Sequence, residues 1–399
     1  MKLPSTCDIF CTVIDNYGDI GVCWRLARQL ASEHGVAVRL WVDDLQALQR
    51  LWPATNIDRE RQRIAGVAVC KWQEPFVAVE PADIAIEAFA CELPASYIQS
   101  LAQRAHKSLW INLEYLSAEG WVAACHGLPS PQSAQPSPRA LEKYFFFPGF
   151  SDRTGGLLRE RELLSRRHEF QRDPAARVEF LARFGVATTP AVRTVSLFAY
   201  ENAALSPLLE AWVNASQPIL CLVPAGKSLA DIGRFFDQPH SEGLGSAGLS
   251  SGGPDPAVGS IYQRGALTLA VLPFLSQDDY DLLLWSCDLN FVRGEDSFVR
   301  AQWAGRPLIW HIYPQRDDAH QPKLNAFLEL YRADLAAPAA AATTACWQAW
   351  NDGGDMAGAW RELEVFLPIL SAHAESWCER LSARENLAAA LVQFCANHV

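Results

Sequence analysis

The sequence lacks the signals of several common protein classes. No apolar run reaches the roughly 18 to 20 residues needed to span a bilayer, and no run of lysine or arginine is longer than a pair. The 399 residues carry 34 basic and 45 acidic side chains, which gives a formal net charge of -11. We therefore expect a soluble protein without a membrane or nucleic-acid partner.

The sequence also lacks common motifs for zinc binding, phosphate binding and paired cysteines. The sequence contains no H-E-x-x-H motif and no P-loop, and its nine histidines show no metal-ligand spacing. The eleven cysteines are scattered and odd in number, and they form no C-x-x-C pair. No secretory leader precedes Asp8, so the composition favours a protein of the reducing cytoplasm.

What the sequence does contain is a regular alternation of short apolar strands and amphipathic helices. Half of the residues are hydrophobic, and the length is sufficient for two domains. In each half the alternation predicts a parallel sheet covered by helices, so the fold class is α/β with two Rossmann-like, doubly wound domains. We expect domains at 1–187 and 190–375, with a last helix at about 379–398 that packs back on the first. Segment 238–260, rich in Gly and Ser, is expected to be a flexible insertion.

The loop between the first expected strand and the first expected helix carries polar residues suited to chemistry. Residues 8–14 predict a strand and residues 20–34 a helix, and the loop between them reads D-N-Y-G-D. Ligands of open α/β sheets bind at the carboxyl ends of strands, where this loop lies. From spacing alone, an alternative in which the glycines are turn residues and Asp19 is only a helix N-cap has about equal weight.

A second junction of strand, glycine and helix occurs in the second half of the chain. The strand is expected to end at Val292 and the helix to begin near Ser297, with the run R-G-E-D-S across the junction. The amides of such a helix start, together with the Arg293 guanidinium, suit a diphosphate. The alternative is a capping arrangement, in which Asp296 or Ser297 caps the helix and Glu295 is solvated.

Four segments carry a family resemblance. They are DNYGDIGVCWRLA at 15–27, SLFAYEN at 196–202, PFLSQDDYD at 273–281 and FVRGEDSFVRAQWAGRPLIWHIYPQ at 291–315. Their order and combination resemble the elongation factor P arginine rhamnosyltransferases, the EarP family, over most of the chain. The resemblance implies a GT-B glycosyltransferase, whose two Rossmann-like domains face a cleft.

The resemblance also implies the reaction. The family transfers L-rhamnose from dTDP-β-L-rhamnose to an arginine of translation elongation factor P with inversion, and this activates the factor for rescue of ribosomes stalled at polyproline. The expected partners are therefore dTDP-rhamnose and elongation factor P, and no cofactor is expected. Two alternatives stay open: a GT-B enzyme with another sugar or a small-molecule acceptor, and a non-catalytic binding module that kept the fold.

The resemblance places donor contacts in both halves of the chain. It implies that aromatic residues and Gln277 surround the thymidine and the sugar, and that the R-G-E-D-S run contacts the diphosphate. Without the resemblance, Phe198 at a strand end would be read as core. The expected donor-binding residues are Tyr17, Gly18, Phe198, Tyr200, Gln277, Tyr280, Arg293, Gly294, Asp296 and Ser297.

The catalytic candidates follow from the acceptor that the resemblance implies. An arginine guanidinium has a pKa above about 12 and arrives as a delocalised cation, which a carboxylate is suited to hold and to deprotonate as the bond forms. We expect Asp19 to be this base and Asp15 to orient the guanidinium, with Glu295 as a third candidate. Glu114 and Tyr115 are expected either to line the same cleft or to form an exposed loop pair.

No metal ion is expected. Metal-dependent glycosyltransferases hold the donor diphosphate through a divalent ion that a D-x-D pair binds. The adjacent carboxylates Asp278 and Asp279 lack that spacing. Neutralising the leaving diphosphate is therefore assigned to Arg293 and the helix start.

Overall fold

The computed structural model describes residues 5–14, 17–89, 91–131, 141–237, 256–315 and 318–398. Most of the expected insertion, residues 238–255, lies outside these ranges. The chain divides into two compact units, of which the first comprises Met1–Leu163, Gln315–Leu330 and Glu379–Val399. The second comprises Leu164–Pro314 and Tyr331–Cys378. The chain thus first passes from one unit to the other at Leu163, and not at residues 187–190 as the sequence suggested.

The first unit is built on a seven-stranded sheet in the order β3-β4-β2-β1-β5-β6-β7. All neighbouring strands are parallel except β3, which pairs antiparallel with β4 across the turn at Ala65 and Gly66. Both turn residues have positive φ, as a two-residue hairpin requires. The strands are β1 (Thr6–Cys11), β2 (Ala37–Val42), β3 (Arg61–Ile64), β4 (Val67–Lys71), β5 (Ile84–Ala88), β6 (Leu109–Leu113) and β7 (Lys143–Phe146).

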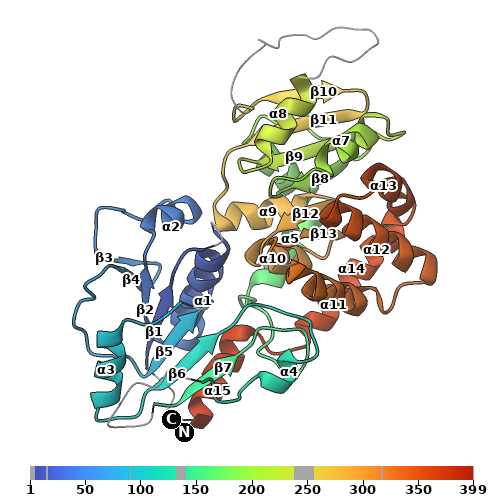
Figure 1. Cartoon of the computed structure of the whole chain (residues 1–399). Helices are drawn as coiled ribbons and strands as arrows, with labels where there is room; N and C mark the ends of the chain where they lie inside the picture. Colours follow the sequence, from blue (N-terminus) through green and yellow to red (C-terminus); the bar gives the residue numbers. More distant parts are fainter. Residues whose placement is uncertain are drawn as a thin grey trace. The chain divides into compact units, whose positions relative to one another are not determined.

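Helices cover this sheet, and the first of them follows the sequence pattern closely. Helix α1 runs over Gly18–His34 and ends at Gly35, whose left-handed conformation (φ 66°) lets its amide donate to the carbonyl of Leu30. Helix α15 (Leu387–His398) packs against α1 (Figure 1). The other helices of this unit are α2 (Leu45–Leu51), α3 (Ala95–Gln103) and the short α4 (Val122–Cys125).

The second unit repeats the plan with six strands in the order β10-β11-β9-β8-β12-β13. Its strands are parallel except for the edge hairpin of β10 and β11. The predicted parallel sheets are therefore confirmed in both units, whereas the antiparallel edge strands were not predicted. The strands are β8 (Arg193–Leu197), β9 (Ile219–Pro224), β10 (Ile261–Arg264), β11 (Leu267–Leu272), β12 (Leu289–Arg293) and β13 (Leu308–His311).

Two helices ahead of β8 explain why the division lies earlier than expected. Phe180 and Leu181 of α6 (Pro174–Ala182) are buried in one core with Leu220 and Leu283, and Phe170 of α5 (Leu163–Arg172) packs against the same core. The charged pattern of this segment thus hides a narrow apolar face that belongs to the second sheet. The other helices are α7 (Leu205–Val213), α8 (Leu229–Asp237), α9 (Gln277–Ser286), α10 (Asp296–Trp303), α12 (Ala337–Asp352) and α13 (Met356–Glu364).

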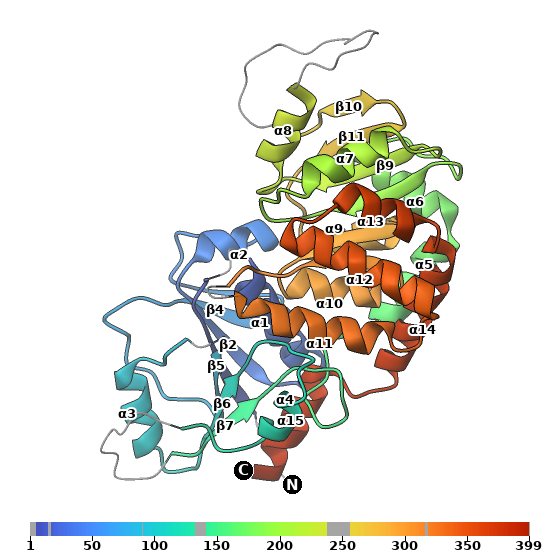
Figure 2. The same cartoon turned by 45° about the vertical axis from the view of Figure 1, so that its right-hand side comes forward.

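The last part of the chain contains two helices where one was expected. Helix α14 (Leu367–Ser382) ends before α15 begins, so the expected single helix at 379–398 is wrong in its bounds (Figure 2). Asn386 accepts a hydrogen bond from the amide of Ala389 and so forms the start of α15. Helix α14 and helix α11 (His320–Arg332) both extend across the division between the units.

Three features of composition can be placed on this fold. The eleven cysteines are free, and ten of them are buried. The exception is Cys125, which is half-buried. Among the helices of the described residues, none is both long and apolar enough to cross a bilayer.

Two glycines of nearly equal backbone conformation provide a test of how the C-terminal segment docks on the first unit. Gly156 (φ 72°) lies against the carbonyl oxygen of Glu385, and a Cβ at this position would overlap that oxygen. Gly185 (φ 71°) has no atom within 4 Å of a Cβ. Gly185→Ala should cost only the backbone strain of roughly 1–2 kcal/mol, whereas Gly156→Ala adds the clash. We expect Gly156→Ala to lower the melting temperature clearly more than Gly185→Ala, and equal losses would contradict the docking.

Candidate functional site

The polar residues at the carboxyl ends of the second sheet come together at its switch point. The strand order reverses at β8, which has β9 on one side and β12 on the other (Figure 1). Ligands of open α/β sheets bind in the crevice outside such a point. Phe198 and Tyr200 follow β8, and Arg293 is the last residue of β12. Three of the expected donor-binding residues thus lie at the switch point.

Arg293 is a buried cation that forms no ion pair with any of the described residues. Its side chain is 6% exposed, and its guanidinium carbon lies 4.4 Å from the ring centroid of Phe198 and 4.5 Å from that of Tyr200. Within the described part of the chain, its Nε has no hydrogen-bond partner and no carboxylate forms an ion pair with it. Two cation–π contacts offset only part of the desolvation of a charge, at about 0.5–2 kcal/mol each. The arrangement is therefore suited to an anion that completes it.

The loop after Arg293 leads directly into the first turn of helix α10. Gly294 has a positive φ of 60°, and the indole Nε1 of Trp310 donates to its carbonyl oxygen at 2.8 Å. The Ser297 hydroxyl accepts from the amide of Arg293 at 3.1 Å and donates to its carbonyl oxygen. Glu295 occupies the N-cap position of α10, but its side chain makes no capping hydrogen bond. The expected alternative, a cap by Asp296 or Ser297, is therefore wrong.

Gln277 and Tyr280 of α9 join this group. Gln277 is buried and donates from Nε2 to Oδ2 of Asp296 at 3.1 Å, which ties the start of α9 to the start of α10. The Tyr280 ring lies 5.6 Å from the Phe198 ring. Burial raises the pKa of the Tyr280 phenol, whereas the Ser297 hydroxyl and the nearby Arg293 charge lower it. The structure thus brings the expected donor-binding residues of the second unit into one connected cluster.

Sequence reasoning missed two residues that shape this cluster. A Cβ on Gly226, which follows β9, would lie 3.2 Å from the Phe198 ring, so the loop after β9 packs closely on that ring. The run A-G-K-S between a strand and a helix is the signal that could have identified this loop. Trp310 stacks on Phe298 with ring centroids 3.9 Å apart and holds the Gly294 carbonyl. It lies inside β13, and the pattern around it gave no signal.

The sequence contains a D-x-D pair that the prediction of a metal-free site did not consider. Asp279 and Asp281 have that spacing. Asp281 is buried and accepts two hydrogen bonds from the Arg300 guanidinium, at 2.8 and 2.6 Å. Asp279 pairs with Arg183 at 2.9 Å. Both carboxylates are therefore engaged by arginines of their own unit, and the described residues contain no group of three or more His, Cys, Asp or Glu placed to hold a metal ion.

The first unit presents Asp19 near the carboxyl end of its β1 strand. Asp19 is 2% exposed, lies in the first turn of α1 and accepts a hydrogen bond from the amide of Ile14 at 3.0 Å. It is not the N-cap residue, which is Tyr17. The expected alternative of a helix cap is therefore wrong in its geometry, although the carboxylate does hold the loop backbone. Asp15, the second catalytic candidate, lies outside the described residues.

The remaining expected contacts of the first unit are Tyr17 and Gly18. The Tyr17 hydroxyl accepts from the Arg50 guanidinium at 2.8 Å. Gly18 is the first residue of α1. These two residues and Asp19 belong to the first unit, whereas all other described candidates, including Glu295, belong to the second.

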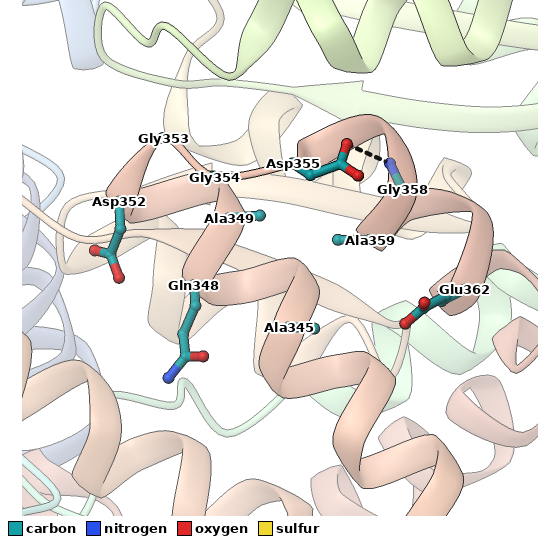
Figure 3. A pocket seen from close by; sticks show the side chains of 10 residues that line it. All are labelled: Ala345, Gln348, Ala349, Asp352, Gly353, Gly354, Asp355, Gly358, Ala359 and Glu362. Carbon is teal, nitrogen blue, oxygen red and sulfur yellow. Dashed lines mark hydrogen bonds between the residues drawn. The ribbon is translucent and has the colours of Figure 1, made fainter.

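A separate hollow lies on the second unit, between α12 and α13. It has a volume of about 510 Å³ and is open to solvent (Figure 3). Asp352, Asp355 and Glu362 stand around small residues, and the Asp355 carboxylate accepts from the amide of Gly358, 2.9 Å away, as the cap of α13. None of the expected site residues lines this hollow.

Comparison of the whole chain with known proteins gives one consistent result. A family model described as Elongation-Factor P (EF-P) rhamnosyltransferase EarP matches residues 7–396. A protein-arginine rhamnosyltransferase of Pseudomonas aeruginosa is 54% identical over 390 residues, covering 98% of this chain and 98% of that protein. A protein-arginine rhamnosyltransferase of Neisseria meningitidis serogroup B is 35% identical, covering 99% of this chain and 98% of its own length.

Solved structures agree with the sequence matches. A structure described as the structural basis for EarP-mediated arginine glycosylation of translation elongation factor EF-P superposes with a TM-score of 0.67 at 38% identity, and covers 99% of both chains. A glycosyltransferase of Rickettsia africae matches with a TM-score of 0.51 at 9% identity, covering 99% of this chain and 97% of its own, which is a likeness of fold alone. The predicted GT-B fold class is confirmed.

The uncompensated guanidinium of Arg293 leads to a binding prediction. Arg293→Met keeps much of the side-chain volume but removes the charge, and charge-assisted contacts contribute about 1.5–3 kcal/mol. We expect dTDP binding, measured by calorimetry, to weaken at least about tenfold. Arg264→Met is the matched control: its guanidinium also lies over two rings, those of Phe235 and Phe236, but it pairs in register with Leu267 at the amino end of β11. Equal affinity for wild type and Arg293→Met would place the diphosphate elsewhere.

Proposed function

The chain belongs to the elongation factor P rhamnosyltransferase (EarP) family of protein-arginine rhamnosyltransferases, and we propose that it transfers L-rhamnose from dTDP-β-L-rhamnose to one arginine of elongation factor P, with inversion at the sugar. The observation that carries the proposal is Arg293, a buried cation between Phe198 and Tyr200 that forms no ion pair with a carboxylate of the described residues. A nucleoside diphosphate sugar supplies the anion that this site lacks.

The second unit provides the donor subsite. The diphosphate lies at Arg293 and the first amides of α10, where the helix dipole adds about 0.3–1 kcal/mol for an anion. The thymidine and the sugar lie against the aromatic group that contains Phe198 and Tyr280, and the Gln277 amide contacts the base. Negative charge that develops on the leaving diphosphate is stabilised by the Arg293 guanidinium. The donor is thus held by charge without a metal ion, as we propose for this enzyme.

The first unit provides the acceptor subsite. The arginine of the acceptor is a cation, and Asp19 is the buried carboxylate that takes its proton as the bond from nitrogen to the anomeric carbon forms. The bond from that carbon to the diphosphate oxygen breaks at the same time, and dTDP leaves with the electron pair. Inversion requires the nitrogen to attack opposite the leaving group, so the base and the phosphate-binding groups act on opposite sides of the anomeric carbon. Glu295, at the N-cap of α10, is the candidate that shares the catalytic role.

One reaction tests the proposal. The protein is incubated in EDTA with dTDP-β-L-rhamnose and purified elongation factor P, and the factor is examined by mass spectrometry. We expect one added deoxyhexose on one arginine, at a rate that magnesium does not change. An unmodified factor with turnover of a small-molecule acceptor instead would support another GT-B reaction, and a requirement for magnesium would refute the metal-free mechanism.

Variants of two aspartates that hold the same loop can distinguish a loss of catalysis from a change in loop structure. Asp19 accepts from the amide of Ile14 and Asp43 from the amide of the preceding Val13, each at 3.0 Å, so both shape the same loop. Asp19→Asn should leave dTDP affinity within a few-fold of wild type and reduce transfer by at least the roughly 10²-fold expected for a lost base. Asp43→Asn should transfer at near wild-type rate. A fast Asp19→Asn enzyme, or equal loss in both variants, would move the role of base to Asp15 or Glu295.

A further inference from the structure

The carboxyl edge of the first sheet carries a second group of side chains suited to a cation. The strand order of this sheet reverses at β1, which lies between β2 and β5. The loop with Asp19 follows β1, Phe89 follows β5 and Glu114 follows β6, and parallel pairing brings these three strand ends to one edge. The amide of Phe89 donates to the carbonyl of Leu113 at 2.9 Å, which fixes the start of this edge. Ligands of open α/β sheets bind at such an edge.

Phe89 is held in an unfavourable backbone conformation at this edge. Its φ is 55°, in the left-handed region that non-glycine residues rarely adopt, at a cost of about 1–3 kcal/mol. The Phe89 ring is buried and packs on the ring of Tyr115, with centroids 4.8 Å apart and planes 30° apart. The strained backbone thus places one aromatic ring under another, half-buried one. Aromatic faces of this kind attract guanidinium groups.

A carboxylate and a cation both lie near this aromatic pair. Glu114 is half-buried, and its Oε1 accepts from the Asn112 amide at 2.8 Å. Burial raises the pKa of Glu114, and the charges of Lys143 and Lys323 oppose that rise. The ammonium of Lys323, from α11, lies over the Tyr115 ring at 5.6 Å. An aromatic face that already has an ammonium group over it thus lies next to a half-buried carboxylate.

We propose that Glu114 and Tyr115 bind the guanidinium of the acceptor arginine, in the place that the Lys323 ammonium takes in this structure. The planar guanidinium is more weakly hydrated than an ammonium and fits a flat ring and a carboxylate together, so it displaces the lysine. Glu114 and Tyr115 are positioning residues that hold the cation, while Asp19 takes its proton. The inference rests on the proposed acceptor, elongation factor P.

A simpler role for the same residues is to anchor α11 on the first unit. In that case Lys323→Ala and Glu114→Gln should act alike, since each removes one partner of the anchor. Both should then lower the melting temperature and leave the KM for the acceptor unchanged. If Glu114 binds the acceptor, the two variants differ, because loss of Lys323 removes a competing cation and loss of Glu114 removes the binding charge.

Steady-state kinetics with elongation factor P as the varied substrate test the inference. We expect Glu114→Gln and Tyr115→Leu to raise the KM for the factor at least about tenfold, with dTDP affinity and melting temperature close to wild type. Tyr115→Phe, which keeps the ring, should restore most of the affinity, and Lys323→Ala should not raise KM. Glu142→Gln is the matched control, because Glu142 pairs with Lys107 and precedes β7, at the amino end of the sheet.

Direct binding separates this inference from the proposed function. Saturation-transfer NMR with Nα-acetyl-arginine amide measures the guanidinium site without any transfer reaction. If wild type fails to modify elongation factor P but binds the probe through Glu114, only the proposed acceptor is refuted. If the factor is modified and Glu114→Gln changes neither its KM nor probe binding, the assignment of Glu114 and Tyr115 is overturned. A rise in KM that Lys323→Ala matches, with equal loss of melting temperature, also overturns it.

Discussion

The buried guanidinium of Arg293 sets the condition that the second unit has to satisfy. A charge taken out of water costs several kcal/mol unless other groups replace its hydration. Here the rings of Phe198 and Tyr200 supply part of that replacement, at 4.4 and 4.5 Å, while no carboxylate of the described residues supplies the rest. The loop with Gly294, the helix start at Glu295 and the close packing of Gly226 all serve to present this one cation at the switch point. A ligand that brings two negative phosphates relieves the imbalance that the fold leaves.

The two units carry different sets of ionisable groups at the carboxyl ends of their sheets. At the carboxyl edge of the first sheet stand the carboxylates Asp19 and Glu114, and at that of the second stand Arg293 and an uncapped helix start. In the function that we propose, the second unit holds the anionic donor and the first unit holds the cationic acceptor.

Features that depend on neighbours in sequence were predictable, and those that depend on distant contacts were not. The strand, loop and helix around Asp19 and the R-G-E-D-S run were identified because periodicity and glycine mark them within about twenty residues. The edge strands β3 and β10 are short and half exposed, so they lack an apolar pattern. Helices α5 and α6 read as polar, because only a narrow face with Phe170 and Leu181 meets the second core. The meeting of Tyr115 with Lys323 joins segments far apart in the chain and has no local signal.

The D-x-D pair shows why sequence spacing alone does not identify a phosphate site. Helix α9 directs Asp281 inward, where its two oxygens bind the guanidinium of Arg300 at 2.8 and 2.6 Å, and both side chains are nearly fully buried. That carboxylate is therefore committed to a buried ion pair, whose disruption would leave an uncompensated charge at a cost of about 3–5 kcal/mol. The second unit thus contains two buried arginines close together in sequence, one paired with a carboxylate and one not. Arg293 lies at the strand end and has no ion pair among the described residues, and this difference in pairing is the reason why we propose Arg293, and not Arg300, as the group that meets the donor diphosphate.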